Sequence, residues 1–282
     1  MKQKTIKDYS ISKEDFVLEY DEKYKLYKTQ FSNWDTLDRY YQSENYISHT
    51  DGKRNWFEKL YQAVKEITIK QKWNLIQSHF SKKDLKVLDI GCGTGDFLKY
   101  GIEKLNIDGV GVEPNEKASD ISKGKGIHVF NSIDDITNET YDVITLWHVL
   151  EHVPNLENYF SFLSKHLKED GVLIIAVPNF NSYDAKHYGP FWAAWDVPRH
   201  LWHFSKESLS LLLKPYHFKM VKTEPMYFDS FYVSLLSEEY KFGSKNLIRA
   251  VRTGIVSNWK ARTTNEYSSL IYIFKKVDSF VV

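Results

Sequence analysis

The sequence predicts an α/β protein built on a parallel sheet whose two faces are covered by helices. From Leu85 onward, short apolar runs rich in β-branched residues alternate with helix-like segments. The runs read KVLDIG, GVGVEP, IHVFN, YDVITLW and GVLIIAVP, and the helix-like stretch 156–167 precedes Gly171, a stop signal. Near-continuous apolar strands separated by helices are typical of strands that are buried on both faces.

The residues before this sheet form an extension and a helical lead-in. The apolar–aromatic runs 16–20 and 24–29, separated by Asp21-Glu22-Lys23, predict a short hairpin within the extension, 1–50. Apolar residues recur at helical spacing between 56 and 80, which predicts one long amphipathic helix, or two, ending before Ser81. The lead-in is 51–84 and the sheet core is 85–178.

The residues after the core, 179–282, predict a loop, a helical cap and a last strand. The loop is rich in aromatics, His and Pro, and Ser205 to Ser208 open a helix. FKMVKTEPM and SSLIYIFKK read as two further strands, with two helical stripes between them. We therefore predict a loop and cap over 179–265, inserted before a last strand at 268–277.

Composition excludes several classes of protein. The chain has 282 residues, a net charge of +1 and one cysteine, Cys92, which excludes a disulfide framework and a cysteine-built zinc site. The balanced charge gives no global field for nucleic acid or an anionic membrane. No apolar run reaches the roughly 20 residues that span a bilayer, and the first residues lack the apolar region of a secretory signal. We expect a cytoplasmic protein with no membrane span and no nucleic-acid partner, and its oligomeric state stays open.

The stretch VLDIGCGTGDFL, at 87–98, predicts a nucleoside-binding turn. An apolar strand delivers Asp89 and then Gly91, Gly93 and Gly95 to a turn before a helix, where glycine permits positive φ and close approach of a ligand. The helix N-terminus supplies N–H groups that face the ligand. A dinucleotide-binding turn of the GxGxxG type needs a third glycine at position 96, where this chain has Asp96.

Polar residues after the next two strands support this site. Glu113 ends the GVGVEP run, and a carboxylate there accepts hydrogen bonds from both hydroxyls of a ribose. Asn131 and Ser132, after IHVFN, stand where a polar side chain reaches an adenine edge. The alternative for each residue alone is a solvated loop position, but the three elements in this order favour a nucleoside site.

The motifs VLDIGCGTG, GVEP and YDVITLWHVLEHVPN resemble those of class I S-adenosylmethionine-dependent methyltransferases. The resemblance is strong over 85–178 and looser in the later strands. It implies a Rossmann-like, doubly wound, seven-stranded, mostly parallel sheet with a final antiparallel strand, and makes 51–282 the methyltransferase domain. It also implies S-adenosylmethionine as cofactor and S-adenosylhomocysteine as product. The predicted cofactor residues are Asp89, Gly91, Cys92, Gly93, Gly95, Glu113, Pro114, Asn115, Asn131, Ser132 and Trp147.

The segment Trp147 to His152 follows the fourth strand, where the family keeps substrate-facing residues. HVLEH also fits the inverted zinc-peptidase pattern H-x-x-E-H, but that motif needs a helix and a further carboxylate. Some related ubiquinone-pathway O-methyltransferases carry Glu-x-x-Glu-His here and hold a cation. Glu151 and His152 match, while His148 replaces the first Glu. We predict no metal site, with a divalent cation at His148, Glu151 and His152 as the alternative. A further alternative is that Glu151 and His152 only organise the loop, which leaves His148 as the substrate-facing residue.

The loop 179–204 predicts the acceptor site. It follows the fifth strand, at the edge of a parallel sheet where ligands bind, and its aromatics exclude water and contact a cationic sulfonium. PRHLWHF resembles the D-x-P-R-H-x-x-H-F segment of the same methyltransferase group. The alternative is an aromatic lid packed on the core, with Arg199 and Asp196 paired. The predicted substrate-binding residues are Tyr46, His49, Tyr188, Trp192, Trp195, Arg199 and His203.

Together these features predict methylation of a small-molecule hydroxyl by in-line transfer. The acceptor would be a metabolite, a sugar or a lipid-pathway intermediate. Because a hydroxyl must lose its proton, a base of near-neutral pKa is expected. We predict the catalytic residues to be His148 or His200 as the base, with His152 and Glu151 in support. Two alternatives remain: a non-catalytic cofactor-binding or scaffold protein of the same fold, and a nicotinamide-dependent oxidoreductase, which Asp96 disfavours.

Overall fold

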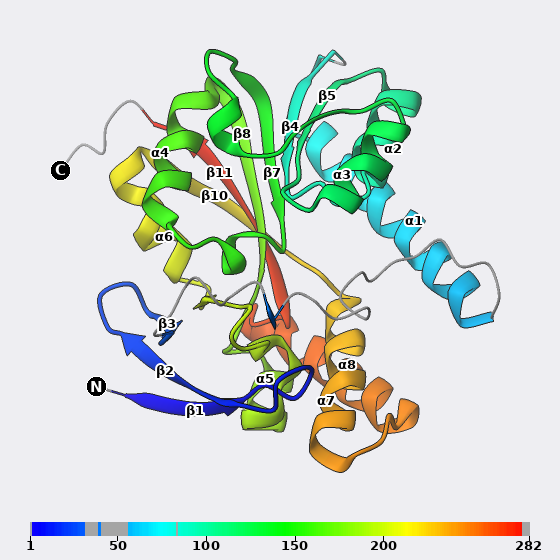
Figure 1. Cartoon of the computed structure of the whole chain (residues 1–282), viewed down its shortest axis with the longest axis vertical. Coiled ribbons are helices and arrows are strands. Elements are labelled where there is room, and N and C mark those ends of the chain that lie inside the picture. Colours follow the sequence, from blue (N-terminus) through cyan, green and yellow to red (C-terminus); the bar gives the residue numbers. More distant parts are fainter. Residues whose placement is uncertain (1, 32–38, 41–55, 83, 278–282) are drawn as a thin grey trace. The chain divides into compact units, whose positions relative to one another are not determined.

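The computed structural model describes residues 2–31, 39–40, 56–82 and 84–277 (Figure 1). The chain divides into two compact units. The first unit contains 1–43, 147–160 and 175–282, and the second contains 44–146 and 161–174. Among the described residues, no helix combines the length and apolar character needed to cross a bilayer.

Seven strands form the main sheet, in the order β10-β11-β8-β7-β4-β5-β6. The neighbours β4–β5, β4–β7 and β5–β6 are parallel, whereas β10 and β11 are antiparallel. This confirms the predicted mostly parallel sheet with helices on its faces and an antiparallel final strand. The strands are β4 (Lys86–Ile90), β5 (Asp108–Val112), β6 (His128–Phe130), β7 (Tyr141–Trp147), β8 (Leu167–Pro178), β10 (Phe218–Pro225) and β11 (Ser269–Lys276).

Three helices belong to the second unit: α1 (Trp56–Gln77), α2 (Asp96–Leu105) and α3 (Glu116–Gly124). The predicted lead-in is thus one helix. Trp73 of α1 is buried, stacks on Phe97 at 4.5 Å and donates from Nε1 to the Phe97 carbonyl oxygen at 2.9 Å. A Cβ at Gly101 would lie 2.2 Å from the Trp73 ring, so only glycine lets α2 approach this closely.

The strand β8 starts four residues before its predicted glycine. The helix α4 (Leu156–His166) ends at His166, and Gly171 lies inside β8. The expectation that Gly171 stops a helix is therefore wrong. A Cβ at Gly171 would meet Leu167 and the Lys168 carbonyl oxygen within 3 Å, so tight local packing accounts for this glycine.

The first unit has a sheet of its own, in the order β1-β2-β3-β9. Its strands are β1 (Gln3–Lys7), β2 (Asp15–Asp21), β3 (Leu26–Thr29) and β9 (Trp202–His203). The β2–β3 pair confirms the predicted hairpin. The sequence did not predict β1, which buries only Ile6, or the two-residue β9. One face of this sheet packs on an aromatic core that includes Phe16, Leu18, Tyr188, Trp192 and Trp195.

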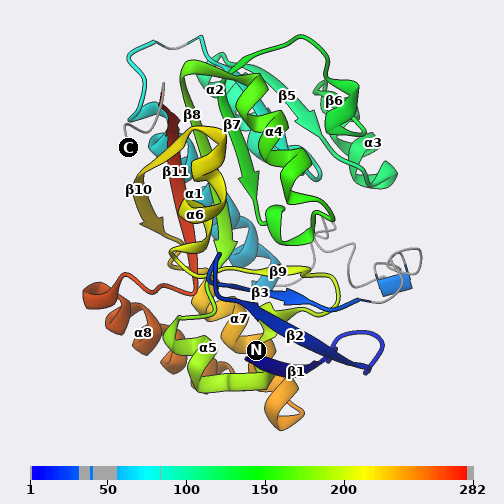
Figure 2. The ribbon, with the colours of Figure 1, turned by 90° about the vertical axis from the view of Figure 1, so that its left-hand side faces the viewer.

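The helices of the first unit after α4 are α5 (Tyr183–Tyr188), α6 (Ser208–Leu213), α7 (Asp229–Phe242) and α8 (Leu247–Thr264). As predicted, a helical insertion precedes the last strand, and it consists of α7 and α8. These two helices pack on each other, and α5 packs against both (Figure 2). Gly254 of α8 allows this approach, since a Cβ there would lie 2.6 Å from the Phe231 ring of α7.

Candidate functional site

The glycine-rich turn lies in the second unit, between β4 and α2. Gly91, Gly93 and Gly95 all have positive φ, at 72°, 54° and 78°. The Gly91 and Cys92 N–H groups donate to the Val112 carbonyl oxygen, which ties the turn to the end of β5. A Cβ at Gly95 would collide with Ser122 and Ile127, whereas a Cβ at Gly93 would meet none of the residues that the structure describes within 4 Å. The turn is therefore packed at Gly95 and open at Gly93.

Glu113, directly after β5, holds the open part of the turn. One carboxylate oxygen accepts from the Gly93 N–H at 2.8 Å, and the other accepts from the Asn115 N–H at 2.9 Å. Burial raises the pKa of this carboxyl, although both backbone bonds oppose the rise. Each carboxylate oxygen has a second lone pair, so Glu113 retains acceptor capacity for a ligand hydroxyl.

Asp89 is buried in the sheet just before the turn. Its carboxylate accepts from Thr145 Oγ1, on the neighbouring strand β7, at 2.6 Å. Burial raises the Asp89 pKa to about 7, and the Thr145 bond counteracts only part of that effect. This carboxyl therefore titrates near neutral pH.

Asp96, where a dinucleotide site has a glycine, fixes the start of α2. Its oxygens pair with Lys65 of α1 at 2.5 Å and with Lys125, after α3, at 2.6 Å. Burial alone would raise the Asp96 pKa, but the two lysines lower it to about 2. In the sequence, Asp96 argues only against a dinucleotide, because the local pattern does not identify its partners 31 and 29 residues away.

The other predicted cofactor residues are dispersed. Asn115 caps α3 by accepting from the Ala118 N–H at 3.1 Å, and Ser132 caps the short helix Ile133–Asp135. Pro114 and Asn131 are exposed. Cys92 is buried, and burial raises the pKa of its thiol. Trp147, the last residue of β7, is half-buried and belongs to the first unit.

His148, in the first unit, lies between two carboxylates. Nδ1 is 3.2 Å from Glu151 Oε1, and Nε2 is 3.0 Å from Asp229 Oδ2 at the start of α7. Burial would lower its pKa, but the two carboxylates outweigh burial and raise the pKa to about 10. The residue also adopts a φ of 58°, in the left-handed region that non-glycine residues rarely occupy. The two carboxylates therefore favour the imidazolium form of His148, in which both ring nitrogens donate.

His152 and His200 each place one ring nitrogen against a backbone carbonyl oxygen. Nδ1 of each ring donates to a backbone carbonyl oxygen, Arg199 at 3.0 Å for His152 and Ala194 at 2.9 Å for His200. In the neutral ring this fixes the lone pair on Nε2. Burial and the neighbouring His200 lower the His152 pKa to about 4. The two rings meet edge to face, with centroids 4.6 Å apart.

Three backbone-directed bonds join the segments that carry these histidines. Besides the His152 bond to Arg199, the Leu201 N–H donates to the Glu151 carbonyl oxygen at 2.7 Å. Trp202 Nε1 donates to the Val153 carbonyl oxygen at 2.8 Å. The short helix Leu150–His152 and the PRHLWHF segment, which are separate motifs in the sequence, therefore form one layer.

This layer gathers three possible metal ligands, Glu151, His152 and His200, with ligand atoms all within 4.8 Å of one another. Glu151 is buried, and its Oε2 has no hydrogen-bond partner among the residues that the structure describes. His200 thus takes the place that the alternative prediction gave to His148, whose nitrogens face Glu151 and Asp229. A glutamate with two histidines is a donor set that suits zinc. The prediction that no metal binds stays a prediction.

Arg199 is buried in an ion-pair network. Its guanidinium contacts Asp196, Asp8 at 3.2 Å and Ser10, and donates to the Tyr40 carbonyl oxygen at 3.3 Å. Burial would lower the Arg199 pKa, but Asp196 and Asp8 raise it. This pairing matches the alternative of a packed lid, and it connects the loop to the first residues of the chain. The Val197–Pro198 peptide bond beside it is cis.

The aromatic residues of the loop are also bonded within the protein. Trp192 donates to Asp184 at 2.8 Å, Trp195 donates to the Gly189 carbonyl oxygen at 2.8 Å, and Tyr188 bonds to Glu238 at 3.0 Å. His203 Nε2 is 2.9 Å from Thr29 Oγ1, and burial lowers its pKa. These residues have structural partners, and their contact with a substrate stays a prediction. Tyr46 and His49 lie outside the described residues.

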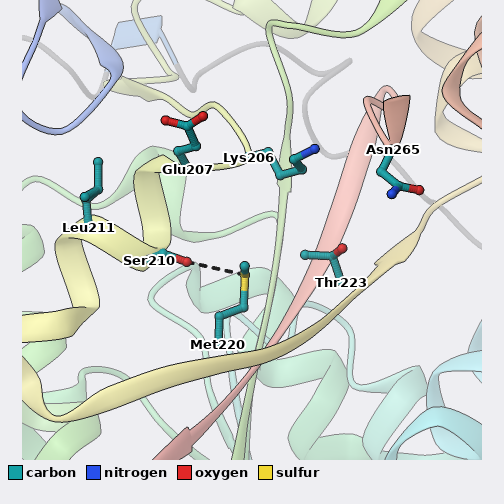
Figure 3. A pocket seen from close by; sticks show the side chains of 7 residues that line it. All are labelled: Lys206, Glu207, Ser210, Leu211, Met220, Thr223 and Asn265. Atoms are coloured by element: carbon teal, nitrogen blue, oxygen red, sulfur yellow. Dashed lines mark hydrogen bonds between the residues drawn. The ribbon is translucent and has the colours of Figure 1, made fainter. Parts of the chain in front are cut away.

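A hollow of about 360 Å³ opens elsewhere in the first unit, between α6 and β10 (Figure 3). Its lining residues are Lys206, Glu207, Ser210, Leu211, Met220, Thr223 and Asn265. None of these is a predicted site residue. Lys206 pairs with Glu266 at 3.6 Å, and Ser210 bonds to the Met220 sulfur. The described lining of the hollow contains no histidine or cysteine and none of the residues that could together hold a metal ion.

Comparison with known proteins agrees with this geometry. Ubiquinone biosynthesis O-methyltransferases are similar to the chain: the Rickettsia canadensis protein is 28% identical over 148 residues, which is 47% of this chain and 60% of that protein. The Rickettsia typhi protein is 25% identical and covers 83% of this chain and 91% of its own length. The chain thus spans less than two thirds of the Rickettsia canadensis relative.

A solved structure shows the same fold. Phosphoethanolamine N-methyltransferase 2 of Haemonchus contortus, in complex with S-adenosyl-L-methionine, matches with a TM-score of 0.51 and 17% identity, over 88% of this chain and 60% of that one. The model of a methyltransferase domain family matches residues 54–223, more than half of the sequence. The chain therefore belongs to the methyltransferase domain family.

Proposed function

We propose that this chain is an S-adenosylmethionine-dependent methyltransferase. The observation that carries the proposal is the turn 91–95, which is open at Gly93 and faces the carboxylate of Glu113 at the end of the next parallel strand. A nucleoside needs both parts: backbone that a ligand can approach closely, and an acceptor pair for ribose hydroxyls. Family membership and the ligand of the Haemonchus contortus structure support the same cofactor.

The residues present fit this cofactor. Gly91, Gly93 and Gly95 would contact the methionine moiety, Glu113 would bind the ribose, and Pro114 and Asn115 would flank the adenine. When bound, S-adenosylmethionine supplies a methyl group that is already activated on a sulfonium. The protein then has to align the acceptor, exclude water and accept one proton.

We assign the proton-accepting role to Nε2 of His200. The His200 Nδ1–H is held by the Ala194 carbonyl oxygen, so the neutral ring presents its lone pair at Nε2. Asp196 Oδ2 lies 3.9 Å from that nitrogen and stabilises the imidazolium that forms. His148 is a poor candidate because both its nitrogens already donate to carboxylates. The acceptor would be a hydroxyl of a small metabolite, sugar or lipid-pathway intermediate, and the O-methyltransferase relatives support this choice.

Calorimetric titration tests the cofactor. We expect micromolar binding of S-adenosylmethionine and S-adenosylhomocysteine, about −8 kcal/mol, and none of NAD. Glu113→Gln should weaken binding about tenfold or more, because it removes a charged acceptor. The control Glu116→Gln alters an exposed carboxylate three residues away and should bind as the wild type does. Binding of NAD alone would overturn the proposal.

Turnover tests the base. With a hydroxyl acceptor from a screen, His200→Ala should lower kcat by about 10²–10⁴-fold and leave cofactor affinity intact. His148→Gln should not reproduce this loss of kcat. Cofactor binding without methylation of any acceptor would favour the scaffold alternative. Unchanged turnover in His200→Ala would refute the base assignment and leave the cofactor assignment standing.

A further inference from the structure

Helix α8 has its large apolar side chains on the outside. Ile248, Val251, Ile255 and Trp259, which we call the α8 stripe, follow one another at intervals of three and four residues and share one face. Their exposed fractions are 83%, 38%, 56% and 65%. The opposite face is buried and made of small residues: Ala250, Thr253, Gly254, Ser257 and Ala261. Burial in the fold therefore does not explain the stripe.

The buried face accounts for the packing of α8 on its neighbours. Gly254 contacts Phe231 of α7, and Ser257 Oγ donates to Asp184 of α5 at 2.6 Å. Beside the stripe, Asn258 Nδ2 donates to the carbonyl oxygen of Tyr227, which is itself 51% exposed. Packing leaves a contiguous outer surface of four large apolar side chains, with an aromatic residue at its margin. An exposed apolar surface of this kind marks an interaction site.

The charge around the stripe has one sign. Between 245 and 265 the chain carries five basic residues and no acidic one, namely Lys245, Arg249, Arg252, Lys260 and Arg262. Arg252 lies four residues after Ile248 and three before Ile255, and it has no ion-pair partner within the described part of the chain. Two of these five cations are neutralised by acids of α7, since Glu238 pairs with Arg249 and Glu239 with Lys245, while Asp229 pairs with His148. Within the described part of the chain, Arg252, Lys260 and Arg262 therefore carry the excess positive charge beside the stripe. Asp184 is buried.

We infer that the α8 stripe binds the surface of an anionic lipid bilayer. A helix with Trp and Ile on one face and basic residues along its borders inserts its apolar side into the headgroup region, while the cations contact anionic lipid. Trp259 suits the headgroup region of the bilayer because an indole has an apolar body and a polar N–H. A second copy of the chain fits less well, since a two-fold contact would place Arg252 and its basic neighbours against their own copies. The net charge of +1 conceals this local excess of positive charge.

Co-sedimentation of the full chain with vesicles tests the inference. We expect binding to equimolar phosphatidylcholine and phosphatidylglycerol, weaker binding to phosphatidylcholine alone, and release by salt. Arg252→Glu should lower the partition coefficient about 25-fold, at about fivefold per unit of charge. Ile248→Ser with Trp259→Ser should lower it about 100-fold. The controls Lys123→Glu and Ile121→Ser make matched changes at exposed positions of α3 and should leave binding unchanged.

A second readout locates the contact. Anionic vesicles should shift the tryptophan emission of the wild type to shorter wavelength, and Trp259→Phe should lose this shift while it still binds. Circular dichroism confirms that each variant is folded. The inference fails if the wild type ignores anionic vesicles, or if Arg252→Glu and the stripe variant bind as well as the wild type. It also fails if these variants alter only the sedimentation coefficient of the protein alone, since the stripe would then join two copies. None of these readouts depends on methyl transfer.

Discussion

At the scale of single residues, His148 and His152 have the same ordinary pKa, and the fold shifts the two pKa values in opposite directions. His148 is flanked by Asp229 and Glu151 and stays protonated. His152 donates to a carbonyl oxygen in a buried setting and stays neutral. The sequence left open whether His148 or His200 is the base, with His152 in support, because spacing does not reveal which nitrogen meets a carboxylate and which meets a carbonyl. Contacts made 47 and 81 residues away in the sequence decide the matter.

Asp229→Asn should lower the His148 pKa from about 10 toward its ordinary value of 6.5. Because the folded-state pKa lies above the unfolded one, His148 contributes stability that is complete below pH 6.5 and is lost as pH rises through about 10. The variant should therefore lose stability near pH 7 and show a flatter decline toward pH 10. Histidine ring resonances followed by NMR against pH measure the pKa, and urea unfolding measures the stability. Asp120→Asn, on the exposed surface of α3, is the control. An unaltered His148 titration would contradict the assigned ion pair.

At the scale of elements, patterns that depend on local periodicity were predictable and patterns that depend on distant partners were not. The alternating runs identified β4, β5, β6, β7 and β8, and the separation of β10 from β11 predicted a helical insertion. The strand β9 has two residues and forms only because β3 is beside it. The aromatic loop reads as a binding segment in sequence, yet Asp8, Asp184 and Glu238 supply partners for its polar atoms.

A glycine of the turn 91–95 can be compared with a glycine outside it, which separates an effect on cofactor binding from an effect of backbone strain. Gly93 and Gly126 both have positive φ, 54° and 81°, and a Cβ at either would lie more than 4 Å from every atom in the described part of the chain. Gly93→Ala and Gly126→Ala should each cost about 1 kcal/mol of stability from backbone strain. Only Gly93→Ala should also weaken S-adenosylmethionine binding, because its Cβ points into the open part of the turn. Thermal unfolding and calorimetry on both variants measure the two effects. Equal affinities in the two variants would remove Gly93 from the proposed site.

The β3–β9 junction depends on one hydroxyl. Thr29 Oγ1 donates to the His200 carbonyl oxygen at 2.7 Å and lies 2.9 Å from His203 Nε2, so His203 must be the donor in that bond. Thr29→Val keeps the shape and leaves two buried polar atoms without their partner, which should cost about 2 kcal/mol or more. Thr5→Val makes the same change at an exposed position of β1 and should stay within about 0.5 kcal/mol. Urea unfolding compares them, and equal losses would show that the Thr29 bonds contribute nothing.

At the scale of the whole molecule, the buried histidines should make the protein sensitive to acid. The folded-state pKa values of His152 and His203 lie below 6.5, at about 4 for His152. The unfolded chain therefore binds more protons below pH 6.5, and stability should fall as pH drops from 6.5 toward 4. His203→Gln with His152→Gln should flatten this part of the profile, even if both substitutions lower stability at pH 7. Melting temperatures across this range give the slope. An identical slope in the double variant would place the acid sensitivity elsewhere.

The pairing of the first strands with β9 has a consequence for how the chain is made. Thr29 leaves the ribosome more than 170 residues before Trp202 and His203, its partners in the small sheet. At about 5–20 residues per second, that interval is roughly ten seconds or more. For this time the apolar side chains Phe16, Leu18 and Tyr27 lack the aromatic core that later covers them. Residues 44–146 emerge meanwhile and contain the parallel strands β4, β5 and β6 and all but the last residue of β7. These strands can pair with one another early, whereas the small sheet of the first unit must wait for β9.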